Sequence, residues 1–308
     1  KHLMMGSCFT EYIGARMENL KFNTDINPFG ILFNPSSIAQ CLKRLISGIP
    51  FTEKDLSQHN GLWHSWLHHG RFSFPSAEET LEAINNRLTF SSTYLRHCDF
   101  LILTFGTAWI YELLSTGVTV SNCHKVPASE FRRFRLTVGE IVAEMRETIE
   151  ELLVYNPDLK IILTVSPVRH LKDGATGNQL SKSTLLLATD ALVNGFGQER
   201  CSYFPSYELV MDELRDYRFY AEDMVHPSPV AIDFIWQKFM TWLFDKEVTK
   251  LSDKISALRQ AYLHRPQHQN TPEFKKFTET QLQRLNEFSK TYPFLDFSTE
   301  INYFAAKL

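Results

Sequence analysis

The sequence predicts an α/β protein with a mostly parallel sheet covered by helices, followed by a helical appendage. Short apolar runs of strand length, such as 100–105 and 160–165, alternate with amphipathic stretches of helical length, such as 77–97 and 137–155. The run 100–105 is almost continuously apolar, which is typical of a central parallel strand buried on both faces. With 308 residues, the chain is long enough for one large domain of this kind with an appendage, or for two domains.

Composition and charge narrow the range of functions. Apolar residues make up 44% and charged residues 22%, which is ordinary for a soluble globular protein. The 32 Lys and Arg against 35 Asp and Glu give a net charge of −3, which does not support a nucleic-acid partner. The best apolar stretch, 99–107, has strand length, so we expect no membrane span.

Five scattered cysteines, without a Cys-x-x-Cys pair, argue against a disulfide framework and a structural zinc site. They favour a reducing compartment, and no signal peptide is visible, so we expect a cytoplasmic location. The chain opens on Lys1 directly before a strand, which leaves room for a missing upstream segment.

The first predicted strand ends in a Gly-Ser turn. The apolar run His2–Gly6 leads to Ser7, and a helical pattern extends from Cys8 to Leu20. This order places the Ser7 hydroxyl at the carboxyl end of a strand and the amino end of a helix, where free N–H groups stabilise negative charge. A Gly-Ser pair alone is common, so its role depends on partners elsewhere in the chain.

A short second strand precedes a loop over 27–35, which is rich in Asn and Pro. Ser36 or Ser37 is expected to cap the next helix, which runs to about Ile46. In the loop, Gly30 is either a turn glycine or a point where a backbone N–H approaches a substrate oxygen.

The stretch 59–72 concentrates histidine and tryptophan. His64 and His68 have the i, i+4 spacing that suits a metal on a helix, but no carboxylate or cysteine completes the set, so we predict no metal. The stretch is either an aromatic loop that packs over a cleft or a wall that binds a sugar or acyl group.

Two central strands end in polar loops. The strand 100–105 is followed by Gly106, Thr107 and Ala108, and residues 113–136 are expected to form a hairpin or an irregular excursion. The strand 160–165 leads to Arg169 and His170, which either bind an anionic group of a substrate or belong to structural salt bridges.

A helix over 182–195 leads to a short strand near Tyr203. After a further loop, Ser228 as N-cap and Pro229 at the first helical position begin a helix to about Phe244. Past Lys246 the composition becomes polar, with helical stretches 247–264 and 272–291 joined by a break at 264–270. We therefore predict a first domain over 1–246 and a helical extension over 247–308, which is a candidate for homodimer contacts or for covering the sheet edge.

Asp223 and His226 precede that last helix of the α/β part. On a turn, an aspartate three residues before a histidine can accept the Nδ1–H of the imidazole, which leaves Nε2 free as a base. Because parallel strands end at one edge of the sheet, this pair is expected near Ser7, Gly30, Thr107 and Arg169.

Together these motifs resemble those of the SGNH, or GDSL-like, hydrolases. They are more closely similar to the GSCFA-domain family, named for a motif that here reads Gly6-Ser7-Cys8-Phe9-Thr10, and the likeness spans about residues 3–240. It implies a three-layer α/β/α fold with a flavodoxin-like sheet. It also implies a serine-type ester hydrolase or acyltransferase that acts on an acylated small molecule or glycan, without a metal or an organic cofactor.

By this resemblance, Ser7 is the nucleophile, His226 the general base and Asp223 its orienting carboxylate. Gly30 is implied as a backbone oxyanion donor beside the N–H of Ser7. Further oxyanion or substrate contacts are assigned to the polar loops that follow the central strands, at Gly106, Thr107, Arg169 and His170.

Two departures from the family pattern bear on the interpretation as a serine-type hydrolase. The usual Gly-Asp-Ser is reduced to Gly6-Ser7, and Ala108 stands where an Asn oxyanion donor is usual. Losing one such donor typically costs about 2.7–4 kcal/mol of transition-state stabilisation. Either the Thr107 hydroxyl or a backbone N–H replaces it, or the enzyme is slow or inactive. The competing interpretation is a catalytically silent module that binds a carbohydrate or another ligand on a hydrolase fold.

Overall fold

The computed structural model describes residues 1–268 and 271–308; Gln269 and Asn270, the end of the predicted break between two C-terminal helices, lie outside the described residues. The chain divides into two compact units. The sheet unit comprises 1–14 and 24–236, and the helical unit comprises 15–23 and 237–308. The predicted domain boundary after Lys246 stays a prediction.

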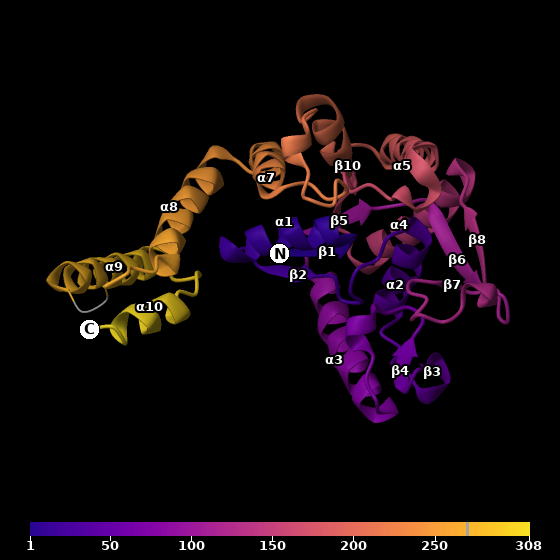
Figure 1. Cartoon of the computed structure of the whole chain (residues 1–308), viewed down its shortest axis with the longest axis horizontal. Coiled ribbons are helices and arrows are strands. Elements are labelled where there is room, and N and C mark those ends of the chain that lie inside the picture. The colour runs from indigo at the N-terminus through magenta and orange to yellow at the C-terminus, as the bar shows by residue number, and fades with distance from the viewer. Residues whose placement is uncertain (269–270) are drawn as a thin grey trace. The chain divides into compact units, whose positions relative to one another are not determined.

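Five parallel strands form the centre of the sheet unit (Figure 1). Their spatial order is β10-β9-β5-β1-β2, which in chain order is 2-1-3-4-5, the flavodoxin-like arrangement. The predicted mostly parallel α/β fold is therefore confirmed. The strands are β1 (His2–Gly6), β2 (Thr24–Ile26), β5 (Phe100–Phe105), β9 (Lys160–Val165) and β10 (Cys201–Tyr203).

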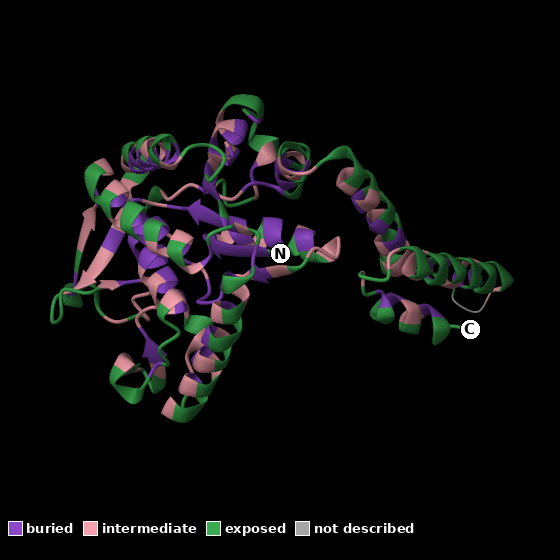
Figure 2. Cartoon of the chain, turned by 180° about the vertical axis from the view of Figure 1, so that it is seen from behind, coloured by how far each residue is buried: buried purple, intermediate pink, exposed green. Residues whose placement is uncertain are grey.

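Helices cover both faces of this sheet. Because side chains alternate along a strand, Leu3, Leu101 and Leu103 point into one core, which they share with four helices. Those helices are α2 (Pro35–Ser47), α3 (Ala77–Arg96), α4 (Val138–Tyr155) and α5 (Gly174–Phe196). On the opposite face, α1 (Cys8–Asn19) approaches β2 closely, since a Cβ on Gly14 would stand 2.5 Å from Ile26 Cδ1. Figure 2 shows the central strands buried and the outer faces of the helices exposed.

Two smaller antiparallel sheets lie outside the central sheet. One lies at the start of the predicted aromatic stretch 59–72, and the other at 113–136, which is predicted as a hairpin or an irregular excursion. Strands β3 (Leu56–His59) and β4 (Leu62–Ser65) form a hairpin through the turn Asn60-Gly61, where both residues have positive φ. Strands β6 (Trp109–Leu113), β7 (Thr119–Val120) and β8 (Phe131–Arg135) form a three-stranded antiparallel sheet in the order β7-β6-β8. The His/Trp-rich stretch therefore contains strand residues at its start and a loop beyond Ser65. The pairing of β6 with β7 agrees with the hairpin alternative for 113–136.

Two helices begin earlier than predicted. The cap of α2 is Asn34, whose Oδ1 accepts the Ser37 N–H at 2.7 Å, because Pro35 occupies the first helical position. Helix α5 begins at Gly174 rather than at Lys182. Its first turns are fixed by tertiary contacts: Asn178 Oδ1 accepts the His170 N–H at 2.9 Å, and Ser181 Oγ accepts the Ala108 N–H at 2.8 Å.

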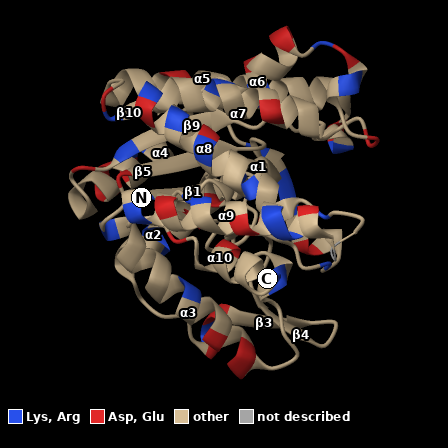
Figure 3. Ribbon diagram, turned by 90° about the vertical axis from the view of Figure 1, so that its left-hand side faces the viewer, with Lys and Arg blue, Asp and Glu red and all other residues tan. Residues whose placement is uncertain are grey.

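The end of the sheet unit agrees with its predicted pattern. Ser228 begins helix α7 (Pro229–Leu243), with the Ala231 N–H 3.4 Å from Ser228 Oγ. A single turn, α6 (Ser206–Glu208), precedes it. Figure 3 shows Lys and Arg residues interspersed with Asp and Glu residues along the helices. No helix within 1–268 or 271–308 is long and apolar enough to cross a membrane.

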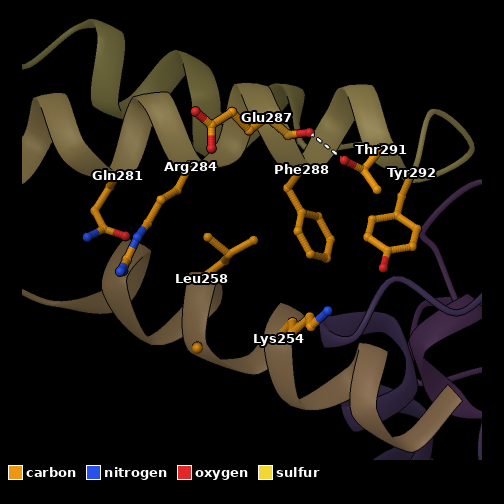
Figure 4. Close-up of a pocket in the computed structure, with 9 residues that line it drawn as sticks. Lys254, Leu258, Gln281, Arg284, Glu287, Phe288, Thr291 and Tyr292 are labelled. Atoms are coloured by element: carbon orange, nitrogen blue, oxygen red, sulfur yellow. Dashed lines mark hydrogen bonds between the residues drawn. The ribbon is translucent and has the colours of Figure 1, made fainter. Parts of the chain in front are cut away.

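The helical unit has its own small core. It contains α8 (Lys246–Leu263), α9 (Pro272–Thr291) and the unpredicted α10 (Ser298–Ala305). Leu285 and Phe304 lie at the centre of this core, and Lys21 pairs with the buried Glu300 at 2.7 Å. Figure 4 shows Leu258 of α8 and Phe288 of α9 at a groove of about 440 Å³ between the two helices.

Candidate active site

Ser7 lies where β1 turns into α1. Gly6 has φ +150°, and a Cβ on Gly6 would come within 2.3 Å of the Thr104 carbonyl oxygen on β5, so this turn requires glycine. Strands β1 and β5 are neighbours at the point where the strand order reverses. Open α/β sheets bind their ligands at the carboxyl edge of that point, and Ser7 stands there.

The Ser7 side chain is closed to solvent. Its exposed fraction is 0%, and Oγ accepts the Phe9 N–H at 3.3 Å, so the hydroxyl caps the first turn of α1. The Ser7 N–H donates to the Thr104 carbonyl at 3.4 Å. No hydrogen bond joins the described side chains of Ser7 and His226. Proton transfer between them therefore requires a movement of these loops or a bridging water.

Asp223 and His226 form the contact that their spacing predicts. His226 Nδ1 lies 2.6 Å from Asp223 Oδ2, and Asp223 Oδ1 accepts the N–H groups of Val225 and His226, each at 2.9 Å. The backbone N–H bonds of His226 and Val225, followed by the imidazole, lower the pKa of Asp223 to about 2. An ionised carboxylate only accepts hydrogen bonds, so the proton sits on Nδ1 and leaves Nε2 as the basic nitrogen.

Arg169 fastens this loop to the end of β9. Its N–H lies 3.3 Å from the Val225 carbonyl, and its guanidinium contacts the Tyr220 hydroxyl at 2.7 Å and lies over the Tyr220 ring at 4.2 Å. The Arg169 guanidinium therefore interacts with the hydroxyl and the ring of Tyr220 rather than with a carboxylate. These contacts favour a structural role for Arg169 over the binding of a substrate anion.

His170 and Ser7 both lie against Gly106. A Cβ on Gly106 would stand 3.4 Å both from His170 Nε2 and from Ser7 Cβ. His170 Nε2 is buried and has no hydrogen-bond partner, and the ring packs edge-on against Phe33. Burial, helped by the charge of Lys182, lowers the pKa of His170 to about 4, so the imidazole is neutral at pH 7.

The predicted backbone donors already have acceptors. Gly30 N–H donates to Asn27 O at 2.8 Å, and the N–H groups of Gly106 and Thr107 both donate to Phe33 O at 2.8 Å. The Thr107 hydroxyl pairs with Ser181 Oγ at 3.0 Å. Gly30 has φ +82°, and its Cβ position would be 2.3 Å from His69 Cβ. Its contacts are thus those of a turn glycine that passes close to another loop.

Lys182 is the site residue that the sequence reasoning missed. It is fully buried on α5, and its ammonium donates to the carbonyls of Gly106 and Ser166, both at 2.6 Å. Burial lowers its pKa to about 7. The spacing in the sequence could have indicated this burial. Lys182 stands three residues before Leu185, which places the two on one face of α5, and both are buried in the structure. The lysine ties the ends of β5 and β9 together beneath the site.

The histidines of the His/Trp-rich stretch are packed with aromatic rings. His64 stacks on His124 with ring centroids 4.0 Å apart, and His68 lies between Phe29 and Phe51 at 4.7 and 5.0 Å. Burial lowers the pKa of His68 to about 3. Within the described ranges, no group of three His, Cys, Asp or Glu side chains is arranged to hold a metal ion.

The fold and the site define an α/β protein with a serine at the switch point of its sheet and an Asp–His pair in the loop before its last helix. The chain belongs to the GSCFA family: residues 1–239 match the model described as "GSCFA family". Residues 255–308 match a second model, "GSCFA domain protein, C-terminal domain".

Two solved structures are similar to the chain. One is an acetyl xylan esterase, Est2A, from the rumen bacterium Butyrivibrio proteoclasticus, with a TM-score of 0.40, 14% identity, and 83% of this chain and 64% of that chain covered. The other is a carbohydrate esterase family 3 protein from Talaromyces cellulolyticus, with a TM-score of 0.38, 9% identity, and 83% and 98% covered. This chain thus spans 64% of the length of Est2A. No curated protein matches the sequence.

Proposed function

We propose that this protein is a serine-type ester hydrolase or acyltransferase that acts on an acylated small molecule or glycan. The observation that carries the proposal is the 2.6 Å contact between His226 Nδ1 and Asp223 Oδ2, in a loop joined by Arg169 to the end of β9. Ser7 follows β1 at the same carboxyl edge of the sheet, with β5 between β1 and β9. Nucleophile, base and orienting carboxylate are the three groups that such chemistry needs.

In the proposed reaction, Ser7 Oγ attacks the ester carbonyl while His226 Nε2 takes the hydroxyl proton. His226 then returns the proton to the leaving alcohol, and a water or a second alcohol releases the acyl group from Ser7. Asp223 stabilises the imidazolium without taking the proton. The Phe9 N–H, which already donates to Ser7 Oγ at 3.3 Å, stabilises negative charge on that oxygen at the amino end of α1.

His170 is our candidate for the missing oxyanion donor. The backbone N–H groups of Gly30, Gly106 and Thr107 are engaged, and Ala108 has no polar side chain. His170 Nε2 is unpartnered, and its neutral imidazole can donate one N–H. Its place beside Gly106, close to Ser7, supports a hydrogen bond to the oxygen of a tetrahedral intermediate.

Turnover of short-chain p-nitrophenyl esters tests the proposal. We expect wild-type protein to hydrolyse the acetate, and Ser7→Ala to reduce the rate to background. Ser115→Ala, at an exposed serine outside the cavity lining, is the matched control that should keep wild-type rates. A wild-type rate no higher than that of Ser7→Ala contradicts the proposal.

A ligand-binding module without catalysis is the second candidate. It is favoured by the closed Ser7 side chain and by the engaged backbone donors. It predicts that Ser7→Ala leaves ligand affinity unchanged and that no ester turns over. Esterase activity that disappears with Ser7→Ala excludes it.

A further inference from the structure

A cavity of about 290 Å³ opens beside the candidate active site. Its lining includes Thr107 and His170, which belong to the loops that end β5 and β9, and residues of the β7-β6-β8 sheet. His170 Nε2 and Ser7 Cβ both lie 3.4 Å from the Cβ position of Gly106. A group bound in the cavity would therefore lie next to the bond that Ser7 is proposed to attack.

Two donors of the cavity lining lack an acceptor. Trp109 Nε1 and Arg133 Nε are buried and have no hydrogen-bond partner. Indole and guanidinium N–H groups donate and never accept, so only an acceptor can satisfy them. A buried donor without a partner is costly, which favours a ligand that brings oxygen atoms.

The side chains that line the cavity carry a net positive charge. Arg133 is paired with Asp173 by two bonds of 2.5 and 2.6 Å, and the guanidinium lowers the pKa of Asp173. That pair is neutral overall, and His170 is neutral at pH 7. The remaining charge of the lining is that of Lys172. Its ammonium donates to the Tyr111 hydroxyl at 2.5 Å and has no carboxylate within ion-pair distance among the described residues.

The aromatic surface of the cavity is partly covered by cations. The Arg133 guanidinium lies 4.3 Å from the Trp109 ring centroid, and the Lys172 ammonium lies 5.1 Å from that of Tyr111. A ring face under a cation offers little apolar surface to an alkyl chain. The lining therefore fits a long acyl chain poorly and a polar, negatively charged group well.

We propose that this cavity binds a small oxyanion-bearing group, a carboxylate or a phosphate on a hydroxylated carbon skeleton, with Lys172 as its charge partner. The identification of that group as part of the ester substrate rests on the proposed function. At about 290 Å³ the cavity is at the small end of ligand pockets, so it suits a single sugar-sized unit. Donation from Trp109 Nε1 and Arg133 Nε to its oxygens requires a shift of the side chains that cover these two atoms.

Calorimetric titration of the full-length Ser7→Ala protein tests the proposal without requiring turnover. The probes are glucuronate, glucose 6-phosphate and glucose, which share a ring and differ in charge. We expect at least one of the two anions to bind roughly tenfold more tightly than glucose, as a charge-assisted hydrogen bond predicts, and to weaken as salt rises. The tighter anion identifies carboxylate or phosphate as the preferred group. Binding of glucose as tight as that of both anions, or binding of neither anion, overturns the proposal.

Lys172→Gln assigns the preference to this cavity. We expect it to remove the roughly tenfold preference for the anion and to leave glucose binding unchanged. Lys54→Gln, at an exposed lysine outside the lining, is the matched control and should keep the preference. A preference that survives in Lys172→Gln overturns the assignment. Anion binding that depends on Lys172 in a protein without esterase activity would reject the proposed function and keep the binding site.

Discussion

Replacing His170 with alanine should slow ester hydrolysis in a protein that still folds. His170 Nε2 makes no hydrogen bond in the structure, so its removal leaves no partner unsatisfied there. The loss of packing against Phe33 should lower the free energy of unfolding by about 2 kcal/mol. If His170 is the donor to the oxyanion, its loss costs about 2.7–4 kcal/mol in the transition state, or roughly 10²–10³ in kcat.

The assay is steady-state hydrolysis of p-nitrophenyl acetate, with a thermal melt of each variant. We expect kcat to fall in His170→Ala with KM little changed, because the hydrogen bond forms only in the transition state. His170→Gln keeps an N–H donor and should recover part of the rate. A His170→Ala protein that is folded and as active as wild type refutes the role of His170 and leaves that of Ser7 standing.

The remaining predictions concern the base, the buried histidines and the helical unit. Asp223→Asn should lower kcat by roughly 10⁴-fold in the same assay, because the amide favours the wrong imidazole tautomer; an unchanged rate would show that Asp223 does not orient the base. Burial lowers the pKa of His68 to about 3 and of His124 to about 4, from 6.5, so the unfolded chain binds their protons first. The free energy of unfolding should therefore fall as pH drops from about 6.5 toward 4 in urea titrations, and His68→Phe should reduce that fall; a flat profile would contradict burial. If the helical unit forms a homodimer, light scattering should give twice the chain mass, and Phe294→Asp, at a ring that is 75% exposed, should shift it to the monomer.

Local patterns were sufficient for much of the fold. Two features that depend only on neighbours in sequence are present in the structure. They are the apolar strands that end at Phe105 and Val165, and the start of a helix at Ser228-Pro229. The early start of α5 was missed because two glycines, Gly174 and Gly177, break its pattern. Contacts of Asn178 and Ser181 with distant loops hold those turns in place.

In the candidate site, too, contacts between residues close in sequence could be predicted and contacts between distant loops could not. The Asp223–His226 contact spans three residues, so the spacing alone predicts it. The engagement of the Gly106 and Thr107 N–H groups by Phe33 depends on a contact between loops more than 70 positions apart, which no local pattern encodes. The burial of Lys182 beneath the same loops likewise follows from the packing of α5 on the sheet.

Covalent labelling of Ser7 tests the central claim most directly. The full-length protein is treated with a serine-directed fluorophosphonate, and the modified residue is located by peptide mass spectrometry. Ser7 as an activated nucleophile predicts one adduct on the peptide that contains Ser7, lost in Ser7→Ala and slowed in Asp223→Asn. An unlabelled Ser7 in folded protein, or labelling that persists in Ser7→Ala, would contradict the claim.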